Sequence, residues 1–145
     1  MLLPLLNPKR VSSLGAVDLL GADDEMLAHL LSTCSVLQEC AAGAPEADRR
    51  LVFGRFASLL WAVRSHDSSV VRRAVVGGFA SCVVTAARAG WVASRGAHGA
   101  DLRQDAGMVE AFAGIHDWAV GVARRDRDAS CREAARELAA AAPLR

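Results

Sequence analysis

The feature that most constrains the fold is the longest stretch without a charged side chain, which runs from Ala74 to Ala87. Nearly every position in it is apolar, so a helix formed here has no polar face to turn toward water and must be covered on every side. The stretch is shorter than the about 20 residues that a helix needs to span a bilayer. We therefore expect a helix over roughly Ser69 to Ala89 in the core of a soluble protein. Within it, Gly77 and Gly78 allow another helix to approach closely.

Four further helices are expected because apolar residues recur at helical spacing, and no segment alternates in the manner of a β-strand. The four apolar stripes are Leu27, Leu30, Leu31, Cys34 and Leu37; Val52, Phe56, Leu59, Leu60 and Val63; Met108, Phe112, Ile115, Ala119 and Val122; and Cys131, Ala134, Ala135 and Leu138. The acidic segment Asp23–Glu25 suits the start of the first of these helices, and Pro45 suits the first turn of the next. Five helices without strands predict an all-α protein.

The length and charge of the chain limit its organisation and its partners. With 145 residues and a net charge of +1, it fits one domain and carries no strong field for nucleic acid or an anionic membrane surface. We expect residues 1–22 to be a leucine-rich N-terminal extension and residues 23–145 to be a single helical domain. A glycine-rich loop is expected at about residues 90–104, where Trp91 has no explanation in the sequence.

Two turns far apart in the chain share an arrangement of aspartate and arginine. His66-Asp67-Ser68-Ser69 opens the central helix, and Arg125-Asp126-Arg127-Asp128 opens the last one, each with an arginine one turn inside. A turn carboxylate can accept hydrogen bonds from the unpaired amides that begin a helix, and the arginine can reach the same or a neighbouring carboxylate. The residues expected to form these joints between helices are Asp67, Arg72, Asp126, Asp128 and Arg132.

The two turns divide the helices into two hairpins. The central helix pairs with the helix before it, and the last two helices pair with each other. A two-helix unit cannot bury its apolar face alone, so neighbouring units stack into a solenoid. The recurring turn aspartate and inner arginine resemble the HEAT-repeat signature. The predicted fold class is an all-α, HEAT- or armadillo-like α-solenoid of stacked antiparallel hairpins.

Residues that could carry catalysis or bind a metal are dispersed. The four cysteines and four histidines show no metal-ligand spacing, and no phosphate-binding loop or nucleophile motif occurs. His116 and Asp117 are neighbours on one helix, so their side chains should diverge by about 100°. Cys131 lies near a helix start, where thiols can become reactive, but its inward position favours a packed apolar residue. We expect no enzyme, no cofactor and no metal.

Two phrases of the sequence resemble the telomere length regulation protein family. The first runs from Leu59 to Ala74, with Leu-Leu-Trp-Ala-Val-Arg-Ser-His before the turn and Val-Arg-Arg-Ala after it. The second runs from Trp118 to Arg132 and contains Trp-Ala-Val, then Val-Ala, then Asp-Arg-Asp-Ala-Ser-Cys-Arg. Members of the family carry phrases of both kinds in the same order. The likeness covers about Glu25 to Ala142.

The resemblance implies the C-terminal end of a longer solenoid of HEAT-like repeats, so this chain would correspond to a fragment, a truncated product or a reduced form. It implies a non-catalytic scaffold that joins two other solenoid proteins in a co-chaperone complex. That complex brings newly made PI3-kinase-related kinases to a heat-shock chaperone, in cytoplasm and nucleus. The family's phosphorylated serine-containing acidic linker has no match here, because the segment Gly21–Glu25 lacks the serine.

Two other functions stay open, and three residues are candidates for an interaction surface. A HEAT-type adaptor in trafficking or nuclear transport would share the same fold. A weak nucleic-acid binder would use arginine pairs such as Arg72 and Arg73. Trp61 and Trp118, which each begin a Trp-Ala-Val triplet, are expected as core anchors, with a binding hot spot as the alternative. Arg73 is the third candidate for an interaction surface, beside Trp61 and Trp118.

Overall fold

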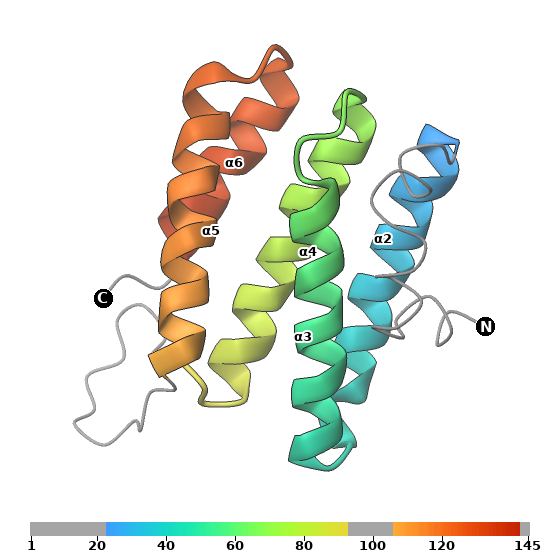
Figure 1. The fold of residues 1–145 in the computed structure, drawn as a ribbon, viewed down its shortest axis with the longest axis vertical. Helices are drawn as coiled ribbons and strands as arrows, with labels where there is room; N and C mark the ends of the chain where they lie inside the picture. The colour runs from blue at the N-terminus through green and yellow to red at the C-terminus, as the bar shows by residue number, and fades with distance from the viewer. Residues whose placement is uncertain (1–22, 93–105, 143–145) are drawn as a thin grey trace. The chain divides into compact units, whose positions relative to one another are not determined.

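A computed structural model describes residues 23–92 and 106–142, and every regular element within these ranges is a helix (Figure 1). The elements are α2 (Asp24–Cys40), the short 3-10 helix η1 (Ala41–Gly43), α3 (Glu46–Val63), α4 (Ser69–Arg88), α5 (Ala106–Arg125) and α6 (Ala129–Ala141). The predicted all-α class and its five α-helices are confirmed. The predicted extension over residues 1–22 and most of the predicted glycine-rich loop lie outside the described residues.

The chain divides into two compact units, Met1–Gly78 and Phe79–Arg145. The single domain over residues 23–145 stays a prediction. The boundary falls inside α4, so one helix contributes its first half to the first unit and its second half to the second. The α3–α4 connection lies in the first unit and the α5–α6 connection lies in the second, and these two connections carry the candidate site.

In the first unit, α2 begins where the sequence placed it. Asp23 is the N-cap, and its Oδ1 accepts a hydrogen bond from the amide of Met26 at 3.1 Å. Leu27, Leu31 and Cys34 are buried as expected. The expectation for Leu37 is wrong, because this side chain is 44% exposed and its neighbour Gln38 is buried instead. A stripe that follows spacings of four, three and four residues turns Leu37 about 100° away from the core.

A similar shift of one position occurs in α3. Phe56, Leu59, Leu60 and Val63 are buried, as predicted. The buried stripe begins at Phe53, however, which the sequence pattern did not select, and the predicted Val52 is only partly buried. A phenylalanine buries more apolar area than a valine, so the helix turns its larger side chain inward.

Gly78 marks a close approach between α3 and α4. A Cβ atom added at this position would lie 2.6 Å from Cδ2 and 2.9 Å from Cδ1 of Leu60, and 3.2 Å from Cζ of Phe56. The same addition at Gly77 would meet nothing within 4 Å. The prediction that this glycine pair admits a neighbouring helix is therefore confirmed for Gly78 alone.

Helix α4 is apolar between Arg73 and Arg88, and about half of its most apolar window is buried. Within the first unit it buries Val71, Val75 and Val76, and within the second Phe79, Cys82, Val83 and Ala86. By length and composition it meets the requirements of a membrane span, and half of its most apolar window is buried inside the fold. The core helix of a globular protein satisfies the same two requirements.

The end of α4 explains Trp91. Gly90 has φ +74°, and the amides of Gly90 and Trp91 donate to the carbonyl oxygens of Ala87 at 3.2 Å and Ala86 at 3.0 Å. This pair of hydrogen bonds is the Schellman motif, in which glycine supplies the left-handed residue and an apolar side chain after it packs back on the helix. Trp91 is accordingly only 2% exposed.

The rest of the second unit is an antiparallel hairpin of α5 and α6, which pack along each other (Figure 1). The buried positions are Phe112, Ile115 and Ala119 on α5 and Cys131, Ala135 and Leu138 on α6, all of which were expected. The expected Met108, Val122 and Ala134 are partly buried. Trp118 meets Phe79 edge to face, with ring centroids 5.4 Å apart and planes at 64°.

Candidate functional site

The α5–α6 turn (residues 126–128) is held by its own aspartates. Oδ1 of Asp126 accepts a hydrogen bond from the amide of Asp128 at 2.9 Å. Asp128 is the N-cap of α6, and its Oδ1 accepts from the amide of Cys131 at 2.9 Å. The hydrogen bond from the Cys131 amide is the main reason that the pKa of Asp128 lies below its usual value. Both side chains therefore satisfy amides that the turn and the first turn of α6 would otherwise leave unpaired.

An arginine closes this turn from inside α6. Nη1 of Arg132 donates to the main-chain carbonyl oxygen of Asp126 at 2.7 Å. The amide of Arg132 donates to the carbonyl oxygen of Asp128 at 3.1 Å and starts the helical ladder. The acceptor shown for the guanidinium is thus a carbonyl, whereas the sequence suggested a carboxylate. Because the acceptor is a main-chain carbonyl oxygen, this hydrogen bond holds the backbone of the turn directly.

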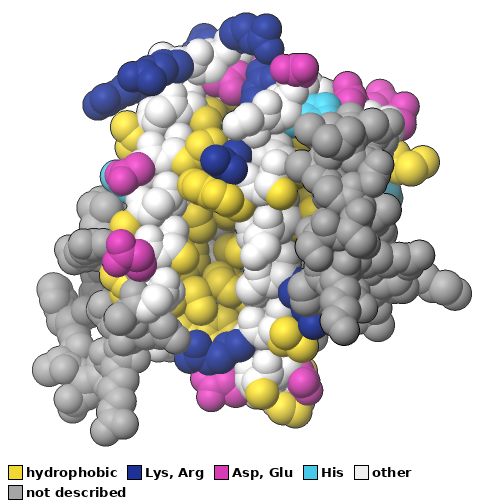
Figure 2. All heavy atoms as spheres, in the orientation of Figure 1, with side chains coloured by type: hydrophobic (Ala, Val, Ile, Leu, Met, Phe, Trp, Pro, Cys, Tyr) yellow, Lys and Arg dark blue, Asp and Glu magenta, His cyan; other side chains and the backbone are white. Residues whose placement is uncertain are grey.

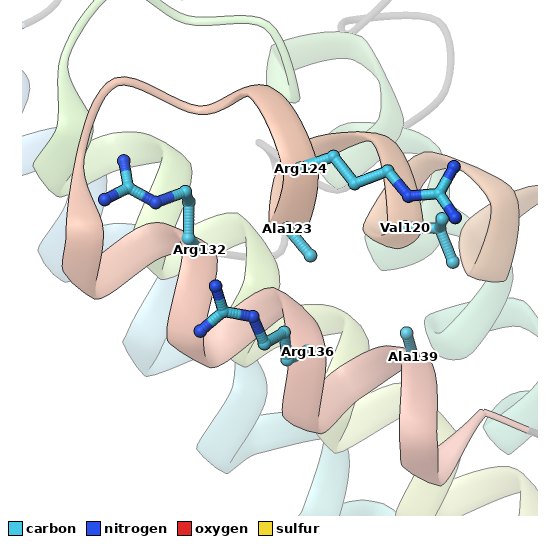
Figure 3. Close-up of a pocket in the computed structure, with 6 residues that line it drawn as sticks. All are labelled: Val120, Ala123, Arg124, Arg132, Arg136 and Ala139. Carbon is cyan, nitrogen blue, oxygen red and sulfur yellow. The ribbon is translucent and has the colours of Figure 1, made fainter.

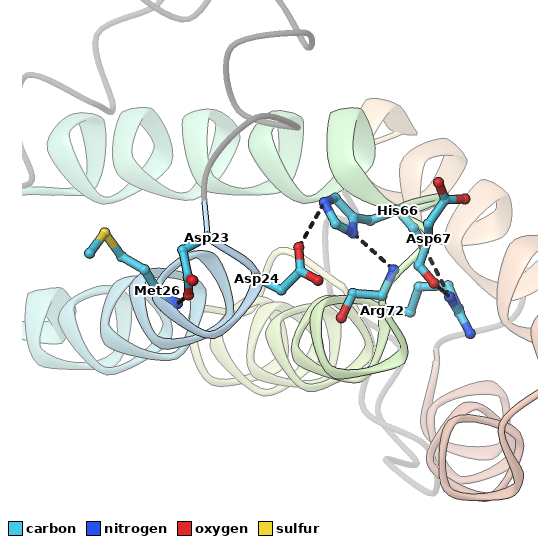
Figure 4. A network of polar contacts seen from close by, with 7 residues as sticks. Asp23, Asp24, Met26, His66, Asp67 and Arg72 are labelled. Atoms are coloured by element: carbon cyan, nitrogen blue, oxygen red, sulfur yellow. Dashed lines mark hydrogen bonds and ion pairs between the residues drawn. The ribbon is translucent and has the colours of Figure 1, made fainter.

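The α3–α4 turn (residues 64–68) has the same construction with different side chains (Figure 4). Nδ1 of His66 accepts a hydrogen bond from the amide of Ser68 at 3.1 Å. Nη1 of Arg72 donates to the carbonyl oxygens of His66 at 3.0 Å and Asp67 at 2.6 Å. The amide of Arg72 donates to the carbonyl oxygen of Ser68 at 3.0 Å.

The two turns correspond residue by residue, with His66 in the place of Asp126. In each turn the side chain of one residue accepts from the amide two positions later, and its carbonyl accepts from the arginine six positions later. The sequence paired Asp67 with Asp126, which is one residue out of register. Asp67 contributes its carbonyl oxygen, and its side chain is exposed. The spacing of six to the arginine is the signal that would have identified His66.

His66 also links its turn to the beginning of α2. The residue is 6% exposed, and its Nε2 lies 3.8 Å from Oδ1 of Asp24 (Figure 4). Because Nδ1 accepts from an amide, the proton of the neutral ring is assigned to Nε2, on the side of Asp24. The imidazole therefore bridges two segments of the first unit.

The candidate interaction residues lie in different environments. The expectation that Trp61 is a core anchor is wrong, because it is 40% exposed and its ring lies under the guanidinium of Arg64 at 4.0 Å. A cation over an exposed indole face is a favourable arrangement that needs no burial. Trp118 is partly buried against Phe79. Arg73 is exposed and lines a groove of about 570 Å³ between α2 and α4, together with Ala74, Gly77 and other residues of these two helices.

A second groove lies between α5 and α6 and is called here the arginine groove (Figure 3). It has a volume of about 540 Å³ and is lined by Val120, Ala123, Arg124, Arg132, Arg136 and Ala139. Figure 2 shows Lys and Arg side chains, in dark blue, gathered over the end of the hairpin where α5 and α6 are joined. The sequence did not indicate this groove, because Arg124 and Arg136 lie on different helices and line one groove only through the packing of the hairpin.

The groups considered for catalysis take ordinary structural positions. Nδ1 of His116 lies 3.5 Å from Oδ1 of Asp117, so the expected divergence of these side chains is wrong, although Asp117 is almost fully exposed. Cys131 is fully buried. Burial raises the pKa of the Cys34 thiol, which favours its neutral form. Among residues 23–92 and 106–142 no group of three His, Cys, Asp or Glu side chains could hold a metal ion.

No protein-family model, curated protein or solved structure matches the chain.

Proposed function

We propose that this chain is a non-catalytic scaffold built from HEAT-like helix hairpins, whose role is to bind other proteins. The observation that supports the proposal best is the shared construction of the two turns. The same side-chain-to-amide bond and the same arginine-to-carbonyl bond recur in both hairpins. A connection that keeps its geometry while it changes its residues is typical of a repeated structural unit.

The chemistry of the turn residues also favours a scaffold. His66, Asp126 and Asp128 are titratable residues of the two turns, and the side chain of each accepts a hydrogen bond from a main-chain amide. A general acid or base needs its polar atoms directed toward a substrate. These atoms are instead used to hold the chain, and arginines close the turns from the other side.

The likeness to the telomere length regulation family gives the proposal its specific form. The two phrases that carry the likeness contain the turn residues His66, Arg72, Asp126, Asp128 and Arg132. In this proposal the hairpins belong to a HEAT-like solenoid in a co-chaperone complex. Its partners would be other solenoid subunits, PI3-kinase-related kinases and the heat-shock chaperone machinery, in cytoplasm and nucleus.

Affinity purification of the tagged full chain from cells tests this proposal. We expect a solenoid subunit or a PI3-kinase-related kinase to be recovered, as identified by mass spectrometry. The double variant Arg72→Ala and Arg132→Ala should lose this recovery, because both turns then lose the arginine that closes them. Trafficking or nuclear-transport proteins in their place would favour a HEAT-type adaptor. Recovery of neither class with a folded chain would overturn the proposal.

A further inference from the structure

The arginine groove combines an apolar floor with a cationic rim. Val120, Ala123 and Ala139 form the floor, and none of the six lining residues is acidic. Figure 3 shows Arg124 extending from α5 past Val120, while Arg132 and Arg136 rise from the facing side of α6. Two helices of the same hairpin therefore contribute three arginines to the lining of one short groove.

The three arginines differ in how far the protein itself satisfies them. Arg124 forms no hydrogen bond or ion pair with any residue that the structure describes, and it is exposed. Arg132 uses Nη1 on the carbonyl oxygen of Asp126, which leaves most of its five N–H donors for another partner. Arg136 forms an exposed ion pair with Glu133 at 2.8 Å, a contact of small net value that a better partner can replace.

We propose that the arginine groove binds a short acidic segment of a partner protein, with carboxylates on the three guanidinium groups and small apolar side chains on the floor. Guanidinium groups bind carboxylates in paired hydrogen bonds, and the alanine and valine floor accepts apolar side chains at the same time. The inference rests on the proposed protein-binding function and adds the chemical class of the partner segment.

A peptide fits these features better than a nucleic acid. A phosphate backbone would gain nothing from Val120, Ala123 and Ala139, whereas an amphipathic peptide uses both the floor and the rim. The carboxylate of Glu133, 2.8 Å from Arg136, also lies beside the groove and would repel an extended polyanion. A groove lined by three arginines, with one carboxylate beside it, is suited to a few carboxylates on a short segment.

Fluorescence polarisation with the purified full chain tests the inference. The probe is a fluorescein-labelled peptide of repeated Glu-Glu-Leu-Leu units, measured at about 0.1 M salt, where surface charges are screened beyond about 10 Å. We expect saturable binding that Arg124→Glu weakens about tenfold or more, as the loss of a charge-assisted contact and its reversal require. Arg124→Lys should fall between the two, because it keeps the charge and loses the planar fork.

Arg125→Glu is the matched control, because Arg125 is the next residue on α5, is also exposed and does not line the groove. This variant should change binding less than threefold, and a Gln-Gln-Leu-Leu probe should bind at least tenfold more weakly than the acidic probe. Equal losses in Arg124→Glu and Arg125→Glu, or no binding of the acidic probe, would overturn the inference. So would tighter binding of a labelled oligothymidylate than of the peptide. Because the assay uses purified protein, it can fail while the affinity purification above succeeds, and the two proposals are judged separately.

Discussion

The α3–α4 turn and the α5–α6 turn reach the same backbone geometry with different chemistry. In the first, the acceptor side chain is a buried imidazole, and in the second it is the carboxylate of Asp126. The arginine is the shared element, since Arg72 and Arg132 both donate to the carbonyl six residues earlier. The difference teaches that the fold requires an acceptor and a guanidinium at fixed spacing, and that the identity of the acceptor depends on what covers the turn.

The comparison extends to the residue six positions after the arginine in each hairpin. Six residues after Arg72 the chain has Gly78, under Leu60 and Phe56, and six residues after Arg132 it has Leu138, which is 2% exposed. In the first hairpin, Leu60 of α3 packs against Gly78 of α4. In the second hairpin, the corresponding position on α6 is the buried Leu138.

Replacing Leu138 by alanine should have the largest effect. The substitution removes a fully packed side chain from α6, and comparable changes cost about 2–5 kcal/mol of unfolding free energy. Chemical denaturation followed by circular dichroism measures the loss. A change below about 0.5 kcal/mol, the size typical of surface positions, would mean that Leu138 does not pack as described.

Replacing Gly78 by alanine tests the corresponding position of the first hairpin, by adding a methyl group where Leu138→Ala removes a side chain. The new Cβ would lie within 3 Å of both Cδ atoms of Leu60, and overpacking of this kind costs about 1–3 kcal/mol. Gly77→Ala is the control, because nothing lies within 4 Å of its added Cβ and the substitution raises helix propensity. If the control lost as much stability as Gly78→Ala, the close approach of α3 and α4 would be contradicted.

Replacing His66 tests whether its role is that of Asp126. His66→Ala leaves the amide of Ser68 without its acceptor, and His66→Asn supplies an oxygen as Asp126 does in the other turn. We expect asparagine to retain about 1 kcal/mol of unfolding free energy relative to alanine, the usual net value of such a hydrogen bond. Equal stability of the two variants would show that the acceptor does not matter.

The smallest effect is the pH dependence that Asp128 contributes. Its pKa is lower in the folded chain than its usual value, so the ionised form is favoured by folding. Its stabilising contribution is present above the usual carboxyl pKa and disappears as the pH falls through the lower, folded-state value. Asp128→Asn keeps a capping oxygen but cannot titrate.

Thermal unfolding of the chain and of Asp128→Asn at a series of pH values measures this contribution. The difference between them should stay constant from about pH 8 to pH 5 and decrease at more acidic pH. A difference that grows on acidification would contradict the lowered pKa.

The sequence predicted those parts of the fold that depend on periodicity. The five helices, their starts at Asp24, Glu46, Ser69 and Ala129, and the buried residues of α6 follow from apolar spacing and capping residues. Errors of one position remained at Leu37 and Val52, because adjacent residues on a helix differ by only 100° and packing with other helices selects the buried one. The sequence pattern alone does not determine which of two adjacent residues is buried.

The site was less predictable, for two physical reasons. Trp61 was placed in the core on residue type alone, and the structure covers its ring with Arg64 at the surface instead. His66 was overlooked because a histidine is not a common capping residue, although its spacing of six residues to Arg72 matches the spacing of Asp126 to Arg132. The exposure of Trp61 depends on which neighbouring segments cover its side chain, and the spacing of residues in the sequence does not specify that cover.

The most direct test of the shared turn geometry is a long-range proton–nitrogen NMR spectrum of His66 in the neutral imidazole state. If His66 replaces Asp126 as the acceptor, the spectrum will show a single tautomer with the proton on Nε2 and an unprotonated Nδ1, and the amide of Ser68 will be protected from exchange. A proton on Nδ1, or rapid averaging of both tautomers with an unprotected Ser68 amide, would contradict it.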